Sequence, residues 1–361
     1  MKRILFVVHL PPPIHGVSVM NEIIRSSKSV NGAFNCHYIN LSTAAGIDDL
    51  QKVNLRKYFL GIRVFLKVFL KIVTKKFDSV FISLFPFGPS FYKDSAIVLL
   101  AKLMGIQPIL HLHTQGFRNA YQTSGLKSAF YKTVFRGAEV IVPAASMSED
   151  ISGIYSGRIH ILPNGIPQVN FVNQYAMRPQ TFRILYLSHL IRGKGILIAL
   201  EAARILKEEG LLFKFHIAGA EGDISYSQLE RVIVEYGLQN EIEVRGAKYG
   251  KEKQEEFEQA DVFILPSNYD TFGLVLLEAM QYGVPCISSN TGAIPELLGN
   301  GRGLVLPDLS PGELAKAINF LANHPEERLR MSRAAFAHYE EFYTTTHFEK
   351  GLLAILSGQR N

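Results

Sequence analysis

The chain of 361 residues is 47% hydrophobic, so it can bury a large core, but it exceeds the usual size of a single domain, and two globular domains are expected. Only two cysteines are present, Cys36 and Cys286, which excludes a disulfide-stapled scaffold and indicates a reduced, cytosolic protein. The net charge of +6 is divided unevenly, because residues 1–165 carry 19 Lys and Arg against 8 Asp and Glu, whereas residues 166–361 carry 19 against 24. These counts give +11 and −5, so the two halves are expected to face different partners.

The chain opens with MKRILFVVHLPPP, which predicts a first β-strand. Its apolar run is too short for the core of a signal peptide and is followed by no small-residue cleavage site. Charged residues interrupt every stretch of about 18 apolar residues, so no membrane-spanning helix is expected.

Short apolar runs rich in β-branched residues alternate with longer helical patterns along the chain. This alternation predicts parallel sheets that are covered by helices on both faces. The runs that predict strands are RILFVV (3–8), SVFISLF (79–85), QPILHLH (107–113), EVIVPA (139–144), RILYLSHL (183–190), FKFHIAGA (213–220), IEVRGA (242–247), DVFILPS (261–267) and PCISS (285–289).

The alternation pauses at QVNFVNQYAMRPQ, which is polar and lacks clear periodicity. We therefore predict a domain over 1–165, a linker over 166–181, a second domain over 182–340 and, in 341–361, a helix that returns to the first domain. Two doubly wound α/β domains facing each other across a cleft would bind a ligand at the carboxyl ends of their strands.

Two strand-to-helix turns in the second half have the composition of an anion site. Gly273 precedes a predicted helix, so the amides of Gly273 and Leu274 can approach a ligand, although a tight turn feeding a core helix explains the glycine equally. Arg192 and Lys194 stand among glycines at the start of another helix, which suits a diphosphate, the alternative being a solvated basic loop. No G-x-x-x-x-G-K-[ST] loop is present, and no strand leads into G-x-G-x-x-G.

Two strand ends in the first half are further candidates. In PPPIHGVSVMNEI, Gly16 lets the backbone approach a ligand where a helix starts, the alternative being a rigid loop without a ligand. His111 and His113 alternate with other residues at the end of a buried strand and share one of its sides. Histidines at a strand end are often structural, and that alternative stays open.

The helix predicted over 274–282 carries apolar side chains on nearly every face, yet it contains Glu278. A glutamate is seldom fully buried unless it is paired. Either a basic partner lies inside the domain or the carboxylate is reserved for a ligand. No Asp-x-Asp pair, H-E-x-x-H motif or cysteine cluster is present, so no metal and no other cofactor is expected.

The segment ADVFILPSNYDTFGLVLLEAMQYGVPCISSNTGAIPELL, with LPNGI at 162–166 and SHLIRGKG, resembles the GT-B glycosyltransferases, specifically the retaining glycosyltransferase family 4. In that family an acidic residue, seven positions, a glutamate and a Pro-Glu pair follow in order, as Asp270, Glu278 and Pro295-Glu296 do here. Two positions depart from the family pattern: Asp270 replaces its glutamate, and His189 replaces an arginine, which leaves Arg192 as the substitute.

The resemblance implies a role for each candidate residue. Glu278 would accept hydrogen bonds from the ribose hydroxyls of a nucleotide-sugar. The diphosphate would be held by the 271–274 turn and by the basic loop, His113 would touch the sugar, and Asp270 would position its hydroxyls. The residues so assigned are His113, Lys194 and Asp270 as catalytic groups and Gly16, Arg192, Lys194, Thr271, Phe272, Gly273, Leu274 and Glu278 as donor-binding groups.

By the same resemblance, the protein is expected to be a cytoplasmic, metal-independent transferase that moves a sugar, with retained configuration, from a nucleotide-diphosphate sugar to a saccharide or lipid-linked acceptor in surface-polysaccharide assembly. A non-hydrolysing nucleotide-sugar epimerase and a catalytically silent nucleotide-sugar-binding subunit are the alternatives. No nucleic-acid partner is expected.

Residues 52–76 carry eight Lys and Arg and no acid. Positions 56, 63, 67, 71 and 75 form a cationic stripe on a predicted helix, and Phe59, Val64, Phe65, Val68, Phe69 and Ile72 fill much of the remainder. The segment is consistent with a surface helix whose apolar side covers the first sheet. Because the resemblance places the acceptor in this half, we also expect peripheral binding to an anionic membrane surface at the inner face of the plasma membrane.

Overall fold

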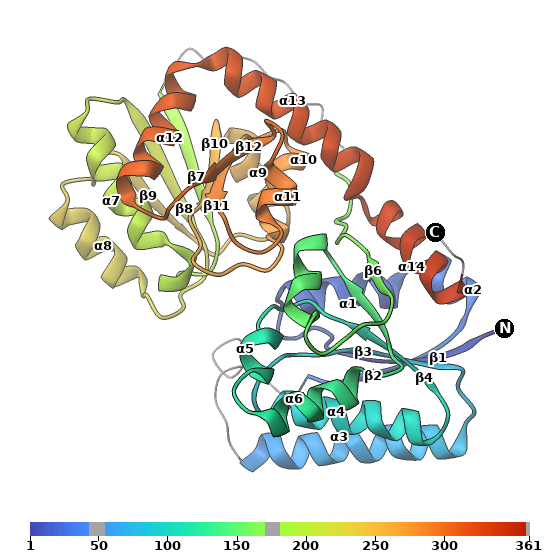
Figure 1. Ribbon diagram of the computed structural model, residues 1–361. Helices are drawn as coiled ribbons and strands as arrows, with labels where there is room; N and C mark the ends of the chain where they lie inside the picture. The colour runs from blue at the N-terminus through green and yellow to red at the C-terminus, as the bar shows by residue number, and fades with distance from the viewer. Residues whose placement is uncertain (43–54, 170–180, 359–361) are drawn as a thin grey trace. The chain divides into compact units, whose positions relative to one another are not determined.

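The computed structural model of the protein describes residues 1–42, 55–169 and 181–358 (Figure 1). The chain divides into two compact units, of which the first comprises Met1–Gly165 and Thr345–Asn361 and the second comprises Ile166–Thr344. Of the predicted linker 166–181, residues 170–180 lie outside the described part of the chain.

The first unit is a six-stranded sheet in which every pair of neighbours is parallel and the order is β2-β1-β3-β4-β5-β6. Continuous apolar runs place its central strands in the core, and Ile4 to Val8 of the first strand are buried on both faces. The strands are β1 (Arg3–Val8), β2 (Asn35–Asn40), β3 (Ser79–Ser83), β4 (Gln107–His111), β5 (Glu139–Val142) and β6 (Ile159–Ile161).

Helices cover both faces of this sheet (Figure 1). One layer contains α1 (Gly16–Ser26), α2 (Lys28–Ala33) and α14 (Thr345–Ser357), and the other contains α3 (Leu55–Thr74), α4 (Gly88–Leu103) and α6 (Gly125–Phe135). Short helices at α5 (Phe117–Tyr121) and η1 (Ala145–Ile151) complete the unit. The last helix thus packs against α2, far from it in sequence, and Ser29 Oγ donates to Glu349 at 2.7 Å.

The second unit is also a six-stranded parallel sheet, with the order β12-β11-β10-β7-β8-β9. Figure 1 shows α7 and α12 on one face and α9 and α10 on the other. The strands are β7 (Phe182–Leu187), β8 (Phe213–Ala218), β9 (Ile242–Gly246), β10 (Val262–Leu265), β11 (Cys286–Ser289) and β12 (Gly303–Leu306). The helices are η2 (Arg192–Lys194), α7 (Ile196–Glu208), α8 (Tyr226–Glu235), α9 (Gly250–Gln259), α10 (Leu274–Gln281), α11 (Ile294–Leu298), α12 (Pro311–Asn323) and α13 (Pro325–Phe342).

The order of the second sheet reverses at β7. The chain passes from β7 through α7 to β8 on one side, whereas β10 pairs with β7 on the other side. Loops that leave two such neighbouring strands diverge to opposite faces, and the crevice at their carboxyl ends is where doubly wound folds bind ligands. Within this unit, we therefore expect a ligand-binding site at the loops after β7 and β10.

Every strand predicted from the sequence is present, and the prediction of two doubly wound parallel α/β domains is confirmed. Three strands were missed: β2, β6 and β12, each at an edge of its sheet. Among the described residues, no helix combines the length and the apolar character needed to cross a lipid bilayer.

Candidate functional site

Lys194 and Asp270 meet at the point where the second sheet reverses. Lys194 ends η2, which follows β7, and Asp270 lies in the loop that follows β10. Lys194 Nζ donates to Asp270 Oδ2 at 2.7 Å and to the Tyr269 carbonyl at 3.4 Å. Two residues that are 76 positions apart, both predicted from the sequence as site residues, are thus in direct contact at the carboxyl edge of the sheet.

Glycines allow the loops of this edge to approach one another. Gly195 has φ +79°, and a Cβ at this position would lie 1.8 Å from the Pro266 carbonyl oxygen. Gly292 has φ +55°, and a Cβ there would lie 2.2 Å from the Asp270 carbonyl oxygen. Any side chain would separate the backbones, so the sequence requires glycine at both positions if Lys194 and Asp270 are to meet.

The 271–274 turn begins α10. Gly273 is its N-cap with φ +80°, and Leu274 is its first residue, so their amides belong to the group that has no partner within the helix. Such amides and the positive end of the helix dipole attract anions. Thr271 is fixed through its carbonyl, which accepts from the Ala293 amide at 2.9 Å, and Phe272 is buried with its ring 6.1 Å from that of Tyr343.

Glu278 has a basic partner in the structure, which is one of the two alternatives that its sequence position allowed. It lies on the partly exposed side of α10 with Leu274 and Val275, and the opposite side is buried. Lys253 of α9 holds it, with Nζ 2.7 Å from Oε1 and 2.6 Å from Oε2. Of the two alternatives for this carboxylate, the structure shows the basic partner, because α9 places a lysine beside it. Sequence reasoning missed Lys253, which lies in a helix so rich in charge that nothing distinguishes it.

Arg192 precedes Lys194 in the same short helix, and its side chain is exposed. Its backbone amide donates to Asp223 Oδ1 at 2.7 Å, which ties this loop to the one after β8. His189, the residue that departs from the family pattern, is half-buried at the end of β7. Arg192 is thus free to reorient its guanidinium while its backbone stays fixed.

Histidines gather at the carboxyl edge of the first sheet. The rings of His111 and His113 are 3.8 Å apart, so the expected shared side is confirmed. His111 is fully buried, and neither its ring nitrogens nor His113 Nε2 has a hydrogen-bond partner among the described residues. Burial, followed by the charge of His15, lowers the pKa of His113 to about 3, so this imidazole is neutral near pH 7.

Two further histidines, His9 and His15, were not selected from the sequence. His9 follows β1, and burial, followed by the charge of Lys93, holds its pKa well below the ordinary value. His15 caps α1: its Nδ1 accepts from the Ser18 amide, and the His15 amide donates to Ser18 Oγ. Gly16 is therefore the first residue of that helix. Their positions in the sequence could have marked them as candidates, because His9 and His15 flank the proline-rich loop after the first strand.

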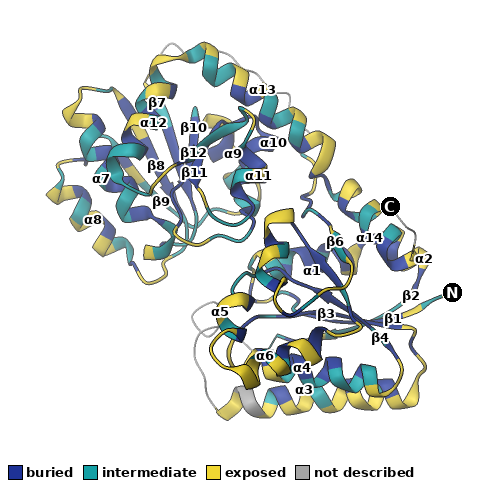
Figure 2. Ribbon diagram, viewed as in Figure 1, coloured by how far each residue is buried: buried dark blue, intermediate teal, exposed yellow. Residues whose placement is uncertain are grey.

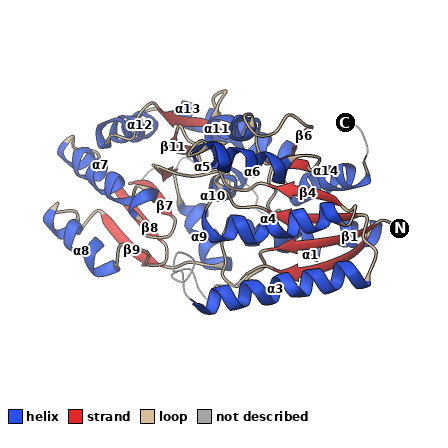
Figure 3. Ribbon diagram, turned by 60° about the horizontal axis from the view of Figure 1, so that its bottom comes forward, coloured by secondary structure: helices blue, strands red, loops and turns tan. Residues whose placement is uncertain are grey.

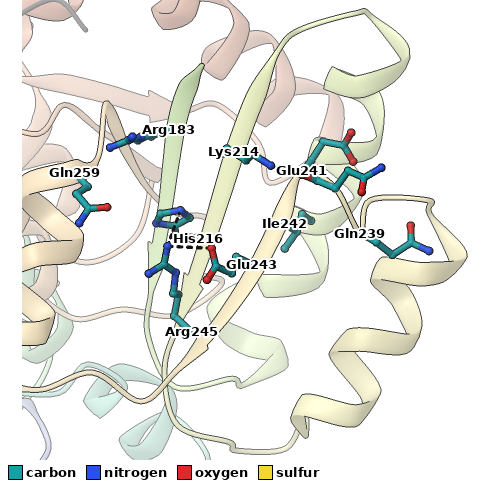
Figure 4. Close-up of a pocket in the computed structure, with 10 residues that line it drawn as sticks. Arg183, Lys214, His216, Gln239, Glu241, Ile242, Glu243, Arg245 and Gln259 are labelled. Atoms are coloured by element: carbon teal, nitrogen blue, oxygen red, sulfur yellow. Dashed lines mark hydrogen bonds and ion pairs between the residues drawn. The ribbon is translucent and has the colours of Figure 1, made fainter. Parts of the chain in front are cut away.

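A pocket of about 320 Å³ lies at the opposite, amino-terminal side of β7, β8 and β9 (Figure 4). His216 Nδ1 and Glu256 Oε2 are 3.2 Å apart, and Arg245 lies 2.9 Å from Glu243. Burial tends to raise the pKa of Glu256, but the His216 hydrogen bond and the Arg245 charge outweigh it and lower the pKa. Because His216, Glu243 and Arg245 of this pocket already have partners, it is a weaker candidate than the Lys194–Asp270 edge.

Among the described residues, no three His, Cys, Asp or Glu side chains gather where they could hold a metal ion. The chemistry available at the Lys194–Asp270 edge and on α10 comes from two lysines, two carboxylates and the amides of a helix start. Such a set suits an anion flanked by hydroxyl groups.

The sequence of this edge recurs in known proteins. Residues 170–338 match the family Glycosyl transferases group 1. This segment contains Lys194, Lys253, Asp270 and Glu278, and thus the whole of the site in the second unit. The homology supports a resemblance to glycosyltransferases, and the assignment to family 4 stays a prediction.

Two curated relatives illustrate the likeness. The chain is 26% identical over 266 residues to the D-inositol 3-phosphate glycosyltransferase of Paenarthrobacter aurescens, which is 67% of this chain and 65% of that protein. It is 30% identical over 203 residues to a protein of Salmonella typhimurium named "Putative colanic acid biosynthesis glycosyltransferase WcaL", covering 51% of this chain and 48% of the relative. The chain therefore matches less than two thirds of the length of each.

The fold is shared over the whole chain. A structure of Anabaena Alr3699/HepE in complex with UDP-glucose is similar with a TM-score of 0.71 at 16% identity, covering 99% of this chain and 100% of that one. At this identity the likeness concerns the fold alone. It confirms the predicted GT-B class, an α/β fold with two Rossmann-like domains.

Proposed function

We propose that the protein is a retaining glycosyltransferase that moves a sugar from a nucleotide-diphosphate sugar to a lipid-linked saccharide. The observation that carries the proposal is the contact of Lys194 with Asp270 beside the start of α10, inside the segment that matches group 1 glycosyltransferases.

The diphosphate binds at the start of α10. The amides of Gly273 and Leu274 donate to phosphate oxygens, and Lys194, which is about a quarter exposed at its side chain, turns toward the same oxygens. Arg192, on the same loop, adds a second cation. Negative charge grows on this group as it leaves, so these contacts strengthen in the transition state and accelerate the reaction.

The ribose binds to Glu278, whose two oxygens can accept from two neighbouring hydroxyls. Lys253 orients the carboxylate while leaving lone pairs on both oxygens for the ligand. Both side chains of the pair are more than a quarter exposed, so the ribose can reach the carboxylate without displacing the lysine.

The sugar binds to Asp270, which has one oxygen engaged by Lys194 and the other left for a hydroxyl. The family resemblance assigns His113 to the sugar, and as a neutral imidazole this side chain can donate one hydrogen bond and accept another. The bond from the anomeric carbon to the phosphate oxygen breaks as the bond to the acceptor oxygen forms on the same face. The acceptor's proton passes to the departing phosphate, so no protein nucleophile is required and the configuration is retained.

The acceptor class rests on two lines of support. One relative is named for colanic acid biosynthesis, a polysaccharide pathway. The first half of the chain carries the excess of positive charge, which suits an acceptor anchored at an anionic surface. No metal is required in this proposal, because lysine and helix amides supply the positive charge.

The experiment is a panel of nucleotide-diphosphate sugars assayed by thermal unfolding and then by transfer. A donor that binds the folded state raises the melting temperature by mass action. Transfer to a polyprenyl-diphosphate saccharide, with an α- or β-configuration matching that of the donor, supports the proposal. Isomerised nucleotide-sugar formed without an acceptor would show an epimerase, and binding without turnover on any acceptor would show a silent binding subunit.

A further inference from the structure

One face of α3 exposes a row of large apolar side chains. They recur at spacings of three and four residues, so they form a stripe along the outer side of the helix. The side chains, between 39% and 77% exposed, are Leu55, Phe59, Ile62, Leu66, Phe69, Leu70 and Val73. Figure 2 shows much of α3 in the colour of exposed residues.

The side chains of the stripe do not pack in the core of the first unit. The opposite side of the helix contributes to that core, because Gly61, Val68 and Ile72 are buried and the helix packs against α4 and β2. Figure 3 shows α3 beside α4. A surface helix that only covers the sheet would be apolar on that side and polar on the other. Part of our expectation for this helix is therefore corrected, since Phe59 and Phe69 face outward with the stripe, whereas Val68 and Ile72 face inward.

Cations lie along one flank of the stripe. Arg56, Arg63, Lys67 and Lys71 follow each other at spacings of seven and four, which places them between the exposed stripe and the buried side. Residues 52–76 contain no acid, and residues 52–54 of this segment lie outside the described part of the chain. A continuous apolar stripe beside a purely cationic flank is the pattern of a helix that lies in a membrane interface.

We propose that α3 docks the protein on an anionic lipid bilayer, lying in the plane of the interface. The apolar stripe enters the boundary between headgroups and acyl chains, and the cationic flank contacts lipid phosphates. Twenty residues give a helix about 30 Å long, so the whole stripe can lie in the interface at once. Exposed apolar surface of this extent on a monomer marks an interaction site rather than an ordinary surface.

Charge selects the bilayer over a second copy of the chain. A symmetric dimer through the stripe would bring two cationic flanks together without an acid in the segment to neutralise them. An anionic leaflet supplies the opposite charge along the whole helix. None of the residues proposed to bind the donor lies on α3, so docking can be measured without sugar transfer and can fail while the proposed activity stands.

The test uses the full chain and vesicles of phosphatidylglycerol mixed with phosphatidylcholine, compared with phosphatidylcholine alone. The chain has no tryptophan, so Leu66→Trp introduces a single fluorescent reporter on the stripe and Leu212→Trp, 81% exposed in the second unit, is its control. Emission of the first should shift to the blue and be quenched by brominated acyl chains, whereas emission of the second should not change.

Binding to anionic vesicles should depend on both the apolar stripe and the cationic flank. Leu66→Glu should weaken co-sedimentation at least tenfold and Lys67→Glu at least fivefold, whereas Leu212→Glu and Lys251→Glu, at exposed positions of the second unit, should leave it unchanged. Circular dichroism establishes that each variant is folded. No binding to anionic vesicles at low salt, binding that ignores the α3 changes, or a dimer that Leu66→Glu dissociates in the absence of lipid binding would each overturn the proposal.

Discussion

Lys253 Nζ lies within 2.7 Å of both carboxylate oxygens of Glu278, so one cation neutralises the acid that is proposed to hold the ribose. The two side chains are 27% and 28% exposed. An ion pair this accessible to water contributes about 0–1 kcal/mol to the free energy of unfolding. The pair therefore matters more for the orientation of the carboxylate than for the stability of the fold.

Glu278→Gln is expected to weaken donor binding at least tenfold, because an amide offers one acceptor oxygen where the carboxylate offers two charged ones. The free energy of unfolding should change by no more than about 1 kcal/mol. Isothermal titration with the nucleotide-sugar and urea denaturation measure the two effects. A variant that unfolds but, where folded, binds the donor normally would make Glu278 a structural residue only.

Lys194→Ala is expected to lower kcat/KM by roughly 10- to 100-fold, since a charge-assisted hydrogen bond contributes about 1.5–3 kcal/mol. Lys251→Ala is the matched control, because Lys251 is a lysine at an exposed position of α9, with 88% of its side chain accessible. Steady-state kinetics of both variants measure the change in kcat/KM. Unchanged kinetics in Lys194→Ala would remove the basic loop from the site.

Gly195→Ala is expected to lower the free energy of unfolding by more than about 2 kcal/mol and to abolish donor binding, because the new Cβ would meet the Pro266 carbonyl oxygen at 1.8 Å. Gly193→Ala is the control on the other side of Lys194. Its Cβ would meet nothing within 4 Å, and its stability should stay within about 1 kcal/mol of the wild type. Equal stability of the two variants would contradict the tight loop packing.

Asp94→Asn is expected to change how stability depends on pH. Asp94 is fully buried on α4, and burial raises its pKa from 3.8 to about 6, although nearby Lys93 lowers it in part. The folded state keeps the proton up to about pH 6 and the unfolded state loses it near pH 4, so ionisation destabilises the fold as the pH rises through this window. The variant should exceed the wild type by roughly 2–3 kcal/mol at pH 7 and equal it near pH 3. Denaturation profiles that run parallel at all pH values would refute this.

Transfer activity is expected to survive EDTA, because Lys194 and the amides at the start of α10 neutralise the departing diphosphate in the proposed mechanism. The measurement compares initial rates before and after exhaustive chelation. Complete loss of activity that one added divalent metal restores would show that a metal ion takes part.

The sequence predicted the buried strands and missed three of the four edge strands for one physical reason. Strands such as β1 and β10 are buried on both faces and therefore read as continuous apolar runs. The missed strands β2, β6 and β12 are mostly half-buried, so their residues are mixed and carry no clear period. Only pairing with a neighbour in the folded sheet makes them strands.

The sequence by itself also determined which residue types make up the site. Its glycines, lysine and carboxylates follow predicted strands, at the points where helices begin and their amides are unpaired. It could not show that Lys253 pairs with Glu278 or that Lys194 meets Asp270, because residues 25 and 76 positions apart come together only through the order of the strands. It likewise indicated an apolar, cationic helix at α3 but not which side faces the core. Burial against α4 and β2 decided that, and it left the apolar stripe of Leu66 and its neighbours exposed to solvent.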